Sequence, residues 1–272
     1  MKFFKPLLDL YINSSIHVAF ACFAFLKITY FSLNIPLNNS VLGFAFFGTI
    51  MGYNFVKFDA LARANKKKMK KQLKIIAMIS FVALVFTVYF FFGLATITKL
   101  IALFFLLLTI LYTLPFFPNR TNARNWAGLK IYIVAFCWVG VTVFLPIINT
   151  DAKLNSIFYL YSTQRFLIVF ILILLFEIID IKNDDPHLKT LPQQIGVKNT
   201  KNLGYLLLMV YCGLSFLYSN FGFPLLELEL SFWVTLIIAL FLFFANENRS
   251  KYYTLFWVES IPILWLLLLF WN

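Results

Sequence analysis

Long apolar runs separated by short polar segments dominate this chain. A segment that crosses a bilayer must be helical, because a helix satisfies its own backbone hydrogen bonds in lipid. We expect nine spans: Ser14–Ser32, Val41–Val56, Ile75–Leu94, Leu100–Phe117, Leu129–Ile148, Gln164–Ile181, Leu203–Phe221, Ser231–Ala245 and Tyr252–Trp271. The second and eighth runs are shorter than the ~20 residues that a bilayer requires. The pattern predicts an all-α membrane protein with a single polytopic transmembrane domain over residues 1–272.

The basic residues between the runs predict the orientation. With the N-terminus in the cytoplasm, nineteen of the 23 lysines and arginines fall on the cytoplasmic side. The exceptions are Lys27, Lys99, Lys153 and Arg165. Cytoplasmic loops carry an excess of Lys and Arg. We therefore expect an integral, multi-pass protein of a bacterial-type inner membrane, with the loops after the second, fourth, sixth and eighth spans in the cytoplasm.

The composition agrees with a membrane protein. Hydrophobic residues make up 62% of the chain and charged residues 12%, and the mean hydropathy is +0.86. Cys22, Cys137 and Cys212 lie inside apolar runs without metal-type spacing, so we interpret them as small buried hydrophobes. The basic cluster Lys66–Lys74 favours an anchor on anionic lipid, or steering of an anionic substrate. Nucleic-acid binding is disfavoured, because no nucleic-acid-reading fold accompanies the cluster.

The most polar segment that follows a span is Glu177–Gly196, which holds four of the eleven acidic residues. Glu177, Asp180 and Asp184 share one face if the helix continues through them. Like charges so close repel unless a cation lies between them. Mg²⁺ takes one or two carboxylates together with the phosphate oxygens of a substrate. The spacing favours a Mg²⁺-diphosphate site at the membrane surface, and the alternative is an acidic helix end beside a solvated loop.

Two further polar groups are expected on the same face of the membrane. Asn54 and Asp59 lie where the second span meets the interface, as a second half-site or as ordinary helix-end polarity. Arg120, Arg124 and Lys130 follow the fourth span. Guanidinium groups bind phosphate oxygens in a bidentate fork, although these cations also fit simple anchoring.

Three further charged residues lie in or beside the apolar runs. Arg165 opens the sixth span, where we expect it to snorkel to the interface. Glu227 is expected in a solvated outer loop. Glu259 lies inside the last run, which makes it a weak candidate for a functional acid.

These motifs resemble those of the UbiA superfamily of intramembrane prenyltransferases. Asp180-Ile-Lys-Asn-Asp184 is similar to the family's Asp-x-x-x-Asp, and Lys189-Thr-Leu-Pro-Gln-Gln-Ile-Gly196 is similar to the tail that follows it. Tyr112 and Lys130 fall where the family has a tyrosine and a lysine near the diphosphate. Nine helices with motifs on the cytoplasmic loops after helices 2 and 6 extend the resemblance over nearly the whole chain.

The first motif departs from the family pattern Asn-x-x-x-Asp-x-x-x-Asp. Asn54 matches the asparagine, but Phe58 and Ala62 occupy the aspartate positions. Asp59 is one residue out of register, which rotates it by about 100° around a helix.

The resemblance implies a nine-helix, UbiA-like bundle with a central cavity that faces the cytoplasm. It implies Mg²⁺ as cofactor, with Asp180 and Asp184 as ligands, and a second ion held by Asn54 with Asp59 as a further candidate. The residues it implies for substrate binding or catalysis are Lys130, Arg120, Arg124, Tyr112, Lys189 and Asn54. The donor would be a prenyl diphosphate, and the acceptor an aromatic ring such as a quinone precursor, a sugar-like ring or a porphyrin.

Three functions remain open at this point. The first is an active, Mg²⁺-dependent prenyltransferase. The second is a non-catalytic descendant that binds isoprenoid or other lipid, or acts as an assembly partner, which the lost aspartates favour. The third is a transporter with a midplane ion site, which would need polar residues deep in several spans, where Glu259 is nearly alone.

Overall fold

A computed structural model describes residues 4–64, 71–114, 126, 128–150, 154–220 and 225–271, and every regular element within these ranges is helical. The α-helices are α1 (Phe4–Asn13), α2 (Ile16–Ser32), α3 (Asn39–Ala64), α4 (Lys71–Phe92), α5 (Thr96–Thr113), α6 (Lys130–Val139), α7 (Leu145–Asn149), α8 (Ser156–Asp180), α9 (Leu191–Asn220), α10 (Leu225–Phe244) and α11 (Ile261–Trp271). Three short turns join them: the π-helical η3 (Gly140–Phe144) and η5 (Tyr253–Val258), and the 3₁₀ turn η4 (Pro186–Leu188).

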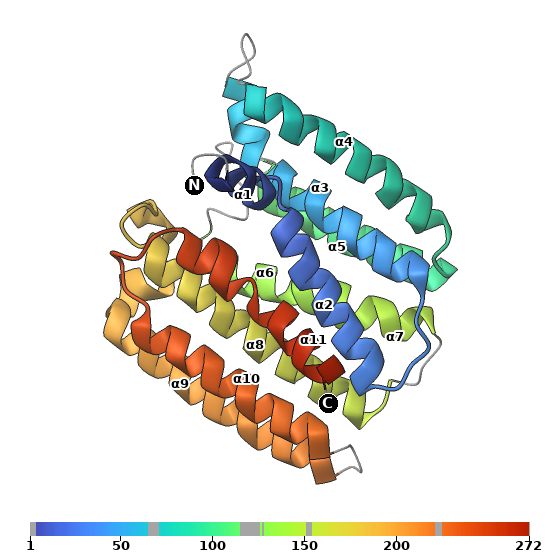
Figure 1. The fold of residues 1–272 in the computed structure, drawn as a ribbon, viewed down its shortest axis with the longest axis vertical. Coiled ribbons are helices and arrows are strands. Elements are labelled where there is room, and N and C mark those ends of the chain that lie inside the picture. Colours follow the sequence, from blue (N-terminus) through green and yellow to red (C-terminus); the bar gives the residue numbers. More distant parts are fainter. Residues whose placement is uncertain are drawn as a thin grey trace.

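The helices form the predicted bundle of membrane spans (Figure 1). Among the described residues, eight helical segments are long and apolar enough to cross a bilayer. The pair α1 and α2, bent by 58° at Ser14 and Ser15, makes a ninth if it counts as one span. The predicted fold class is therefore confirmed.

Several predicted spans are too short, because the helices extend beyond the apolar runs. The second span is not short, because α3 begins at Asn39 and ends at Ala64. α8 begins at Ser156 rather than Gln164, and the Asn155 side chain caps it by accepting a hydrogen bond from the Phe158 amide. Polar residues at helix ends lower the local hydropathy without ending the helix, since caps and interfacial groups satisfy them.

α8 lies at the centre of the bundle. Its membrane window is 78% buried, whereas that of α4 is 11% buried. Ile168, Ile171 and Leu175 belong to the core that α8 shares with α2, α6, α9, α10 and α11. Figure 1 shows α4 at one edge of the bundle and α9 with α10 at the opposite edge. Because neighbouring helices cover α8 on most sides, they hold its ends in place.

Arg165 corrects the expectation of snorkelling. It is 3% exposed, in the third turn of α8, because the helix starts earlier than predicted. Its guanidinium donates to the Phe25 carbonyl, to the hydroxyls of Thr142 and Thr29, and to the Tyr161 hydroxyl. It also stacks over the Phe25 ring at 4.2 Å. A cation buried in a lipid-embedded bundle needs such partners, because its desolvation is otherwise uncompensated.

Glu227 corrects a second expectation, because it is buried in the first turn of α10 rather than solvated. Its carboxylate accepts a hydrogen bond of 2.8 Å from the Ser32 hydroxyl. Glu227 and Arg165 both line a small cavity of about 20 Å³, enough for one water molecule. The half of the bundle that holds the start of α8 thus contains a buried polar core.

We predict that Arg165→Met lowers the free energy of unfolding by about 3–5 kcal/mol, because it orphans the partners of a buried charged network. The measurement is denaturation of the detergent-solubilised protein. Arg249→Met serves as the control, since Arg249 is exposed and its guanidinium donates one hydrogen bond within the described ranges, to the Phe244 carbonyl. Equal losses in the two variants would contradict the structural role of Arg165.

Candidate active site

Three groups from the predicted motifs lie at one end of the bundle. The end of α3, the N-terminus and the loop between α8 and α9 all lie on the left in Figure 1. This arrangement follows from the alternating directions of successive spans. It brings Lys130 at the start of α6 and Asp180 at the end of α8 to the end of the bundle toward which the second half of α3, with Asn54, runs.

The end of α8 turns tightly and keeps its acids together. The Asp180 carbonyl accepts hydrogen bonds from the amides of Asn183 and Asp184, at 2.7 and 2.9 Å. The second of these bonds continues helical spacing for one more turn, which leaves Asp180 and Asp184 on the same side. Asp185 then accepts from the His187 amide at 2.9 Å and caps η4. The acidic segment is an ordered turn.

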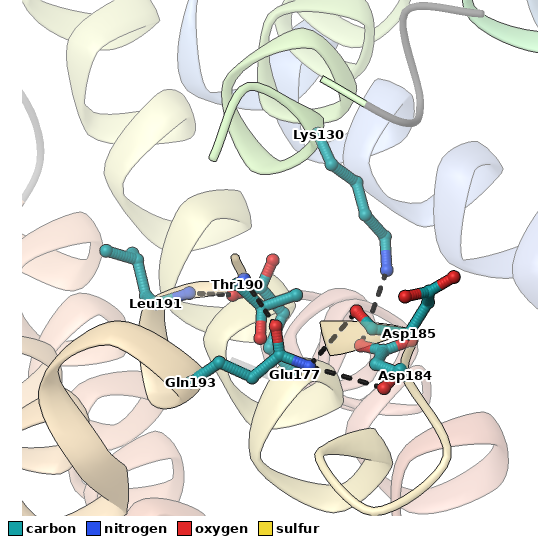
Figure 2. A network of polar contacts seen from close by, with 7 residues as sticks. All are labelled: Lys130, Glu177, Asp184, Asp185, Thr190, Leu191 and Gln193. Carbon is teal, nitrogen blue, oxygen red and sulfur yellow. Dashed lines mark hydrogen bonds and ion pairs between the residues drawn. The ribbon is translucent and has the colours of Figure 1, made fainter. Parts of the chain in front are cut away.

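The segment Thr190-Leu-Pro-Gln193 builds the start of α9 and closes the loop onto α8 (Figure 2). The Gln193 side chain accepts from the Thr190 amide at 3.0 Å, which is one half of a capping box. The same side chain donates to the carbonyls of Asp184 and Asp185. The Leu191 amide donates to Glu177 at 3.1 Å, so the carboxylate satisfies a free N–H at a helix start.

Glu177 is therefore a positioning residue in this structure. It is 2% exposed, whereas Asp180 and Asp184 are only partly buried. Its Oε2 atom accepts a hydrogen bond from the backbone of α9, and this bond fixes the loop that carries Asp184. The three acids expected to act alike thus differ in their environment.

Lys130, the first residue of α6, supplies positive charge to this turn. Its ammonium lies 4.0 Å from Asp184 Oδ2, and the two side chains are 23% and 17% exposed. Figure 2 shows Lys130 pointing from α6 toward the loop. The Gly128 amide donates to the Leu188 carbonyl at 3.2 Å, with Gly128 at a φ of +71°. This backbone contact, which favours glycine, holds the start of α6 against the loop.

The acids at this turn fit a magnesium ion that arrives with a ligand. Asp184 Oδ2 is buried and has no hydrogen-bond donor among the described residues. Asp184 and Asp180 repel each other, and Lys130 offsets only part of that repulsion. No three His, Cys, Asp or Glu side chains in the described ranges gather as a metal cage. Mg²⁺ commonly takes one or two carboxylates and completes its shell with water and phosphate oxygens, so Asp180 and Asp184 suit it.

Asn54 is buried on α3 in a fixed orientation. Its amide nitrogen donates to the Ser14 carbonyl at 3.0 Å and to the Ser80 hydroxyl at 2.9 Å. The Ser14 carbonyl can only accept, so the bond identifies which end of the amide is nitrogen. Asn54 Oδ1 is buried and finds no hydrogen-bond partner in the described ranges. Its role as a metal ligand stays a prediction, and the Asp59 side chain lies outside the described residues.

The other predicted binding residues divide into three cases. Tyr112 is buried near the end of α5, within electrostatic range of Tyr53. Lys189 is exposed, with its carbonyl bound by the Gln194 side chain. Arg120 and Arg124 lie outside the described residues.

Two residues at this end, Lys57 and Glu259, received too little weight as functional candidates in the prediction from the sequence. Lys57, counted only as an interfacial cation, is half-buried, and its ammonium donates to the Ser15 hydroxyl at 3.1 Å. Glu259 follows η5, and the hydroxyl of its neighbour Ser260 lies 3.1 Å from His17 Nε2, close to the same bend. The position of Lys57, three residues after Asn54 and therefore near it on a helical face, was the signal available.

We predict that Glu177→Ala weakens the loop closure more than Glu177→Gln, because glutamine keeps a side-chain oxygen for the Leu191 amide. Loss of a charged hydrogen bond to a backbone amide costs about 1.5–3 kcal/mol. Hydrogen exchange at the start of α9 measures this directly. Equal exchange rates in both variants and the unmodified protein would exclude the positioning role.

The fold has close counterparts among solved structures. A UbiA homologue from Archaeoglobus fulgidus bound to GPP and Mg²⁺ has a TM-score of 0.65 and 14% identity, covering 96% of this chain and 98% of its own. The apo UbiA homologue from Aeropyrum pernix K1 has a TM-score of 0.64 and 13% identity, covering 94% and 98%. A digeranylgeranylglyceryl phosphate synthase has a TM-score of 0.57 and 16% identity, covering 99% and 97%.

No protein-family model matches the chain, and no curated protein matches its sequence. The likeness is therefore one of structure, and it extends over nearly the full length of both partners. It agrees with the motifs at the end of α8 and with the count of spans. The chain has the UbiA fold, as its sequence motifs predicted.

Proposed function

We propose that this protein is an intramembrane prenyltransferase that uses Mg²⁺ to transfer a prenyl group from a prenyl diphosphate to a lipid-soluble acceptor. The observation that carries the proposal is the turn after α8, where Asp180, Asp184 and Lys130 gather at one end of a UbiA-type bundle. Two structural neighbours add support, one bound to GPP and Mg²⁺ and one described as a prenyl-glyceryl phosphate synthase.

The reaction breaks the bond between the allylic carbon and the diphosphate oxygen, and the oxygen keeps the electron pair. The acceptor then bonds to the allylic carbon and loses a proton. Mg²⁺, when bound, neutralises the departing diphosphate as a Lewis acid. Asp180 and Asp184 are the residues that would hold it.

The chain's own residues provide the remaining electrostatics. Lys130 places a fixed positive charge beside the Asp184 carboxylate, where negative charge accumulates on the leaving group. Glu177 and Gln193 hold the acidic turn in place through backbone hydrogen bonds. Such preorganised groups need little rearrangement when the charge develops.

The replacement of the first-motif aspartates by Phe58 and Ala62 favours a second candidate, an isoprenoid-binding protein without turnover. Both candidates require the same diphosphate site. They differ in whether labelled prenyl groups are transferred to an aromatic or lipid acceptor in membranes. Formation of product favours the enzyme.

The site itself is tested by binding of labelled geranyl thio-diphosphate to solubilised protein, with and without Mg²⁺. We predict Mg²⁺-dependent binding that Asp180→Asn and Asp184→Asn each weaken by about tenfold or more, equivalent to 1.4 kcal/mol. Asp185→Asn is the matched control, because Asp185 is exposed and asparagine caps a helix as well as aspartate.

Binding that survives both Asp180→Asn and Asp184→Asn would refute the proposed metal site. Absence of binding in the unmodified protein would refute the proposed donor.

A further inference from the structure

Lys57 is a lysine inside the membrane window of α3, at the end of the bundle that holds the acidic turn. It lies three residues after Asn54 and one residue before Phe58, the first of the two replaced aspartate positions. Intramembrane cations are costly and are retained mainly where they act on a partner or a pathway. Its surroundings therefore indicate what it binds.

The Lys57 ammonium is only partly satisfied. Within the described part of the chain it donates one hydrogen bond, to Ser15 at the bend between α1 and α2. It lies 5.9 Å from the centre of the Tyr53 ring. An ammonium has three donors, so two remain for another acceptor. Glu259 lies close to this bend as well. The hydroxyl of its neighbour Ser260 lies 3.1 Å from His17 Nε2, two residues after Ser15.

A chain of contacts joins Lys57 to the candidate active site. Tyr53 lies one turn deeper on α3, and its hydroxyl accepts a hydrogen bond of 2.8 Å from Trp138 on α6. Lys130 begins the same α6, about 12 Å toward the loop end at 1.5 Å per residue. Lys57 lies about 6 Å from Tyr53 in that same direction along α3. Lys57 and Lys130 therefore both lie on the loop side of the Tyr53–Trp138 contact, one on α3 and the other on α6.

The charge of Lys57 explains how the site can lack two aspartates. A divalent metal ion and the two carboxylates that hold it have a net charge of zero. A lysine brings one positive charge without a metal. Toward an anionic diphosphate, a lysine therefore supplies a net positive charge without a metal ion, and charge-assisted hydrogen bonds from an ammonium are strong.

We propose that Lys57 binds the diphosphate group directly, in place of the second metal ion, and that Glu259 is its counter-ion while the site is empty. This inference rests on the proposed function, and it specifies how one half of that site works. Ser15 and Tyr53 fix the direction of the lysine. Asn54 Oδ1, one helical turn before Lys57, is buried and has no hydrogen-bond partner among the described residues.

The proposal predicts opposite effects at the two charged residues. Lys57→Met removes the cation but keeps the apolar stem, so it should weaken binding about tenfold or more. Lys57→Arg keeps the charge and should bind within about threefold of the native protein. Glu259→Gln removes the competing negative charge, so it should strengthen binding by about threefold.

The experiment uses ³²P-labelled inorganic pyrophosphate and labelled geranyl thio-diphosphate with the full-length protein in detergent. Lys182→Met controls for general surface charge, because Lys182 is exposed and pairs with Glu247 at 3.3 Å. A purely structural Lys57–Glu259 pair would give losses, or no change, in both Lys57→Met and Glu259→Gln. Native-like binding by Lys57→Met overturns the proposal.

The proposed metal site and the proposed role of Lys57 can be refuted independently of each other. If Asp180→Asn abolishes Mg²⁺-dependent binding and Lys57→Met does not weaken it, the proposed function stands and the role of Lys57 is refuted. If Lys57→Met weakens pyrophosphate binding and Asp180→Asn does not, Lys57 binds diphosphate and the proposed metal site is refuted. Should Lys57→Met fail to fold, Glu259→Gln decides: unchanged or weaker binding by that variant overturns the proposal.

Discussion

Every charge inside a lipid-embedded bundle must find an opposite charge or a set of hydrogen bonds, and this constraint organises the structure. Arg165 meets it with four hydrogen bonds from three helices. Glu177 meets it with the first amide of α9. Groups that satisfy the constraint within the protein hold the bundle together. Groups that satisfy it only in part are available for a ligand.

Asp184 and Lys57 belong to the second kind. Asp184 has one buried oxygen without a hydrogen bond, and Lys57 has a single hydrogen-bond partner among the described residues. Asp184 follows the end of α8 and Lys57 lies in the second half of α3, and the two side chains carry opposite charges. A ligand with both a bound cation and anionic oxygens matches such a pair, and a Mg²⁺-diphosphate is that kind of ligand. The rigid, buried α8 keeps the acidic half of the arrangement in place.

The sequence predicted the fold and the acidic turn because both depend on local signals. Apolar runs predict spans, and Asp180 with Asp184 predicts a shared face whether or not the partners are known. The fates of Arg165 and Glu227 could not be predicted, because their burial depends on Thr29, Thr142 and Ser32 from distant helices. Hydropathy also placed the start of α8 too late, and that error alone made Arg165 look interfacial.

The Thr190-Leu-Pro-Gln193 segment shows a different limit. Its resemblance to a family motif pointed to function, whereas its visible role is to cap α9 and fasten the loop to α8. The family motif and the geometry agree that this segment lies at the site, but they indicate different roles for it. Asn54 is similar, since its amide ties three elements together while its oxygen stays free for a ligand. Such double roles appear only when hydrogen bonds are known atom by atom.

The most direct test of the account is a crystal structure with geranyl thio-diphosphate and Mn²⁺ in place of Mg²⁺, read by the anomalous signal of the metal. We predict a single metal peak coordinated by Asp180 and Asp184, with the diphosphate between that metal and Lys57. A metal peak away from the end of α8, a second metal peak beside Asn54, or a diphosphate remote from Lys57 would contradict this arrangement.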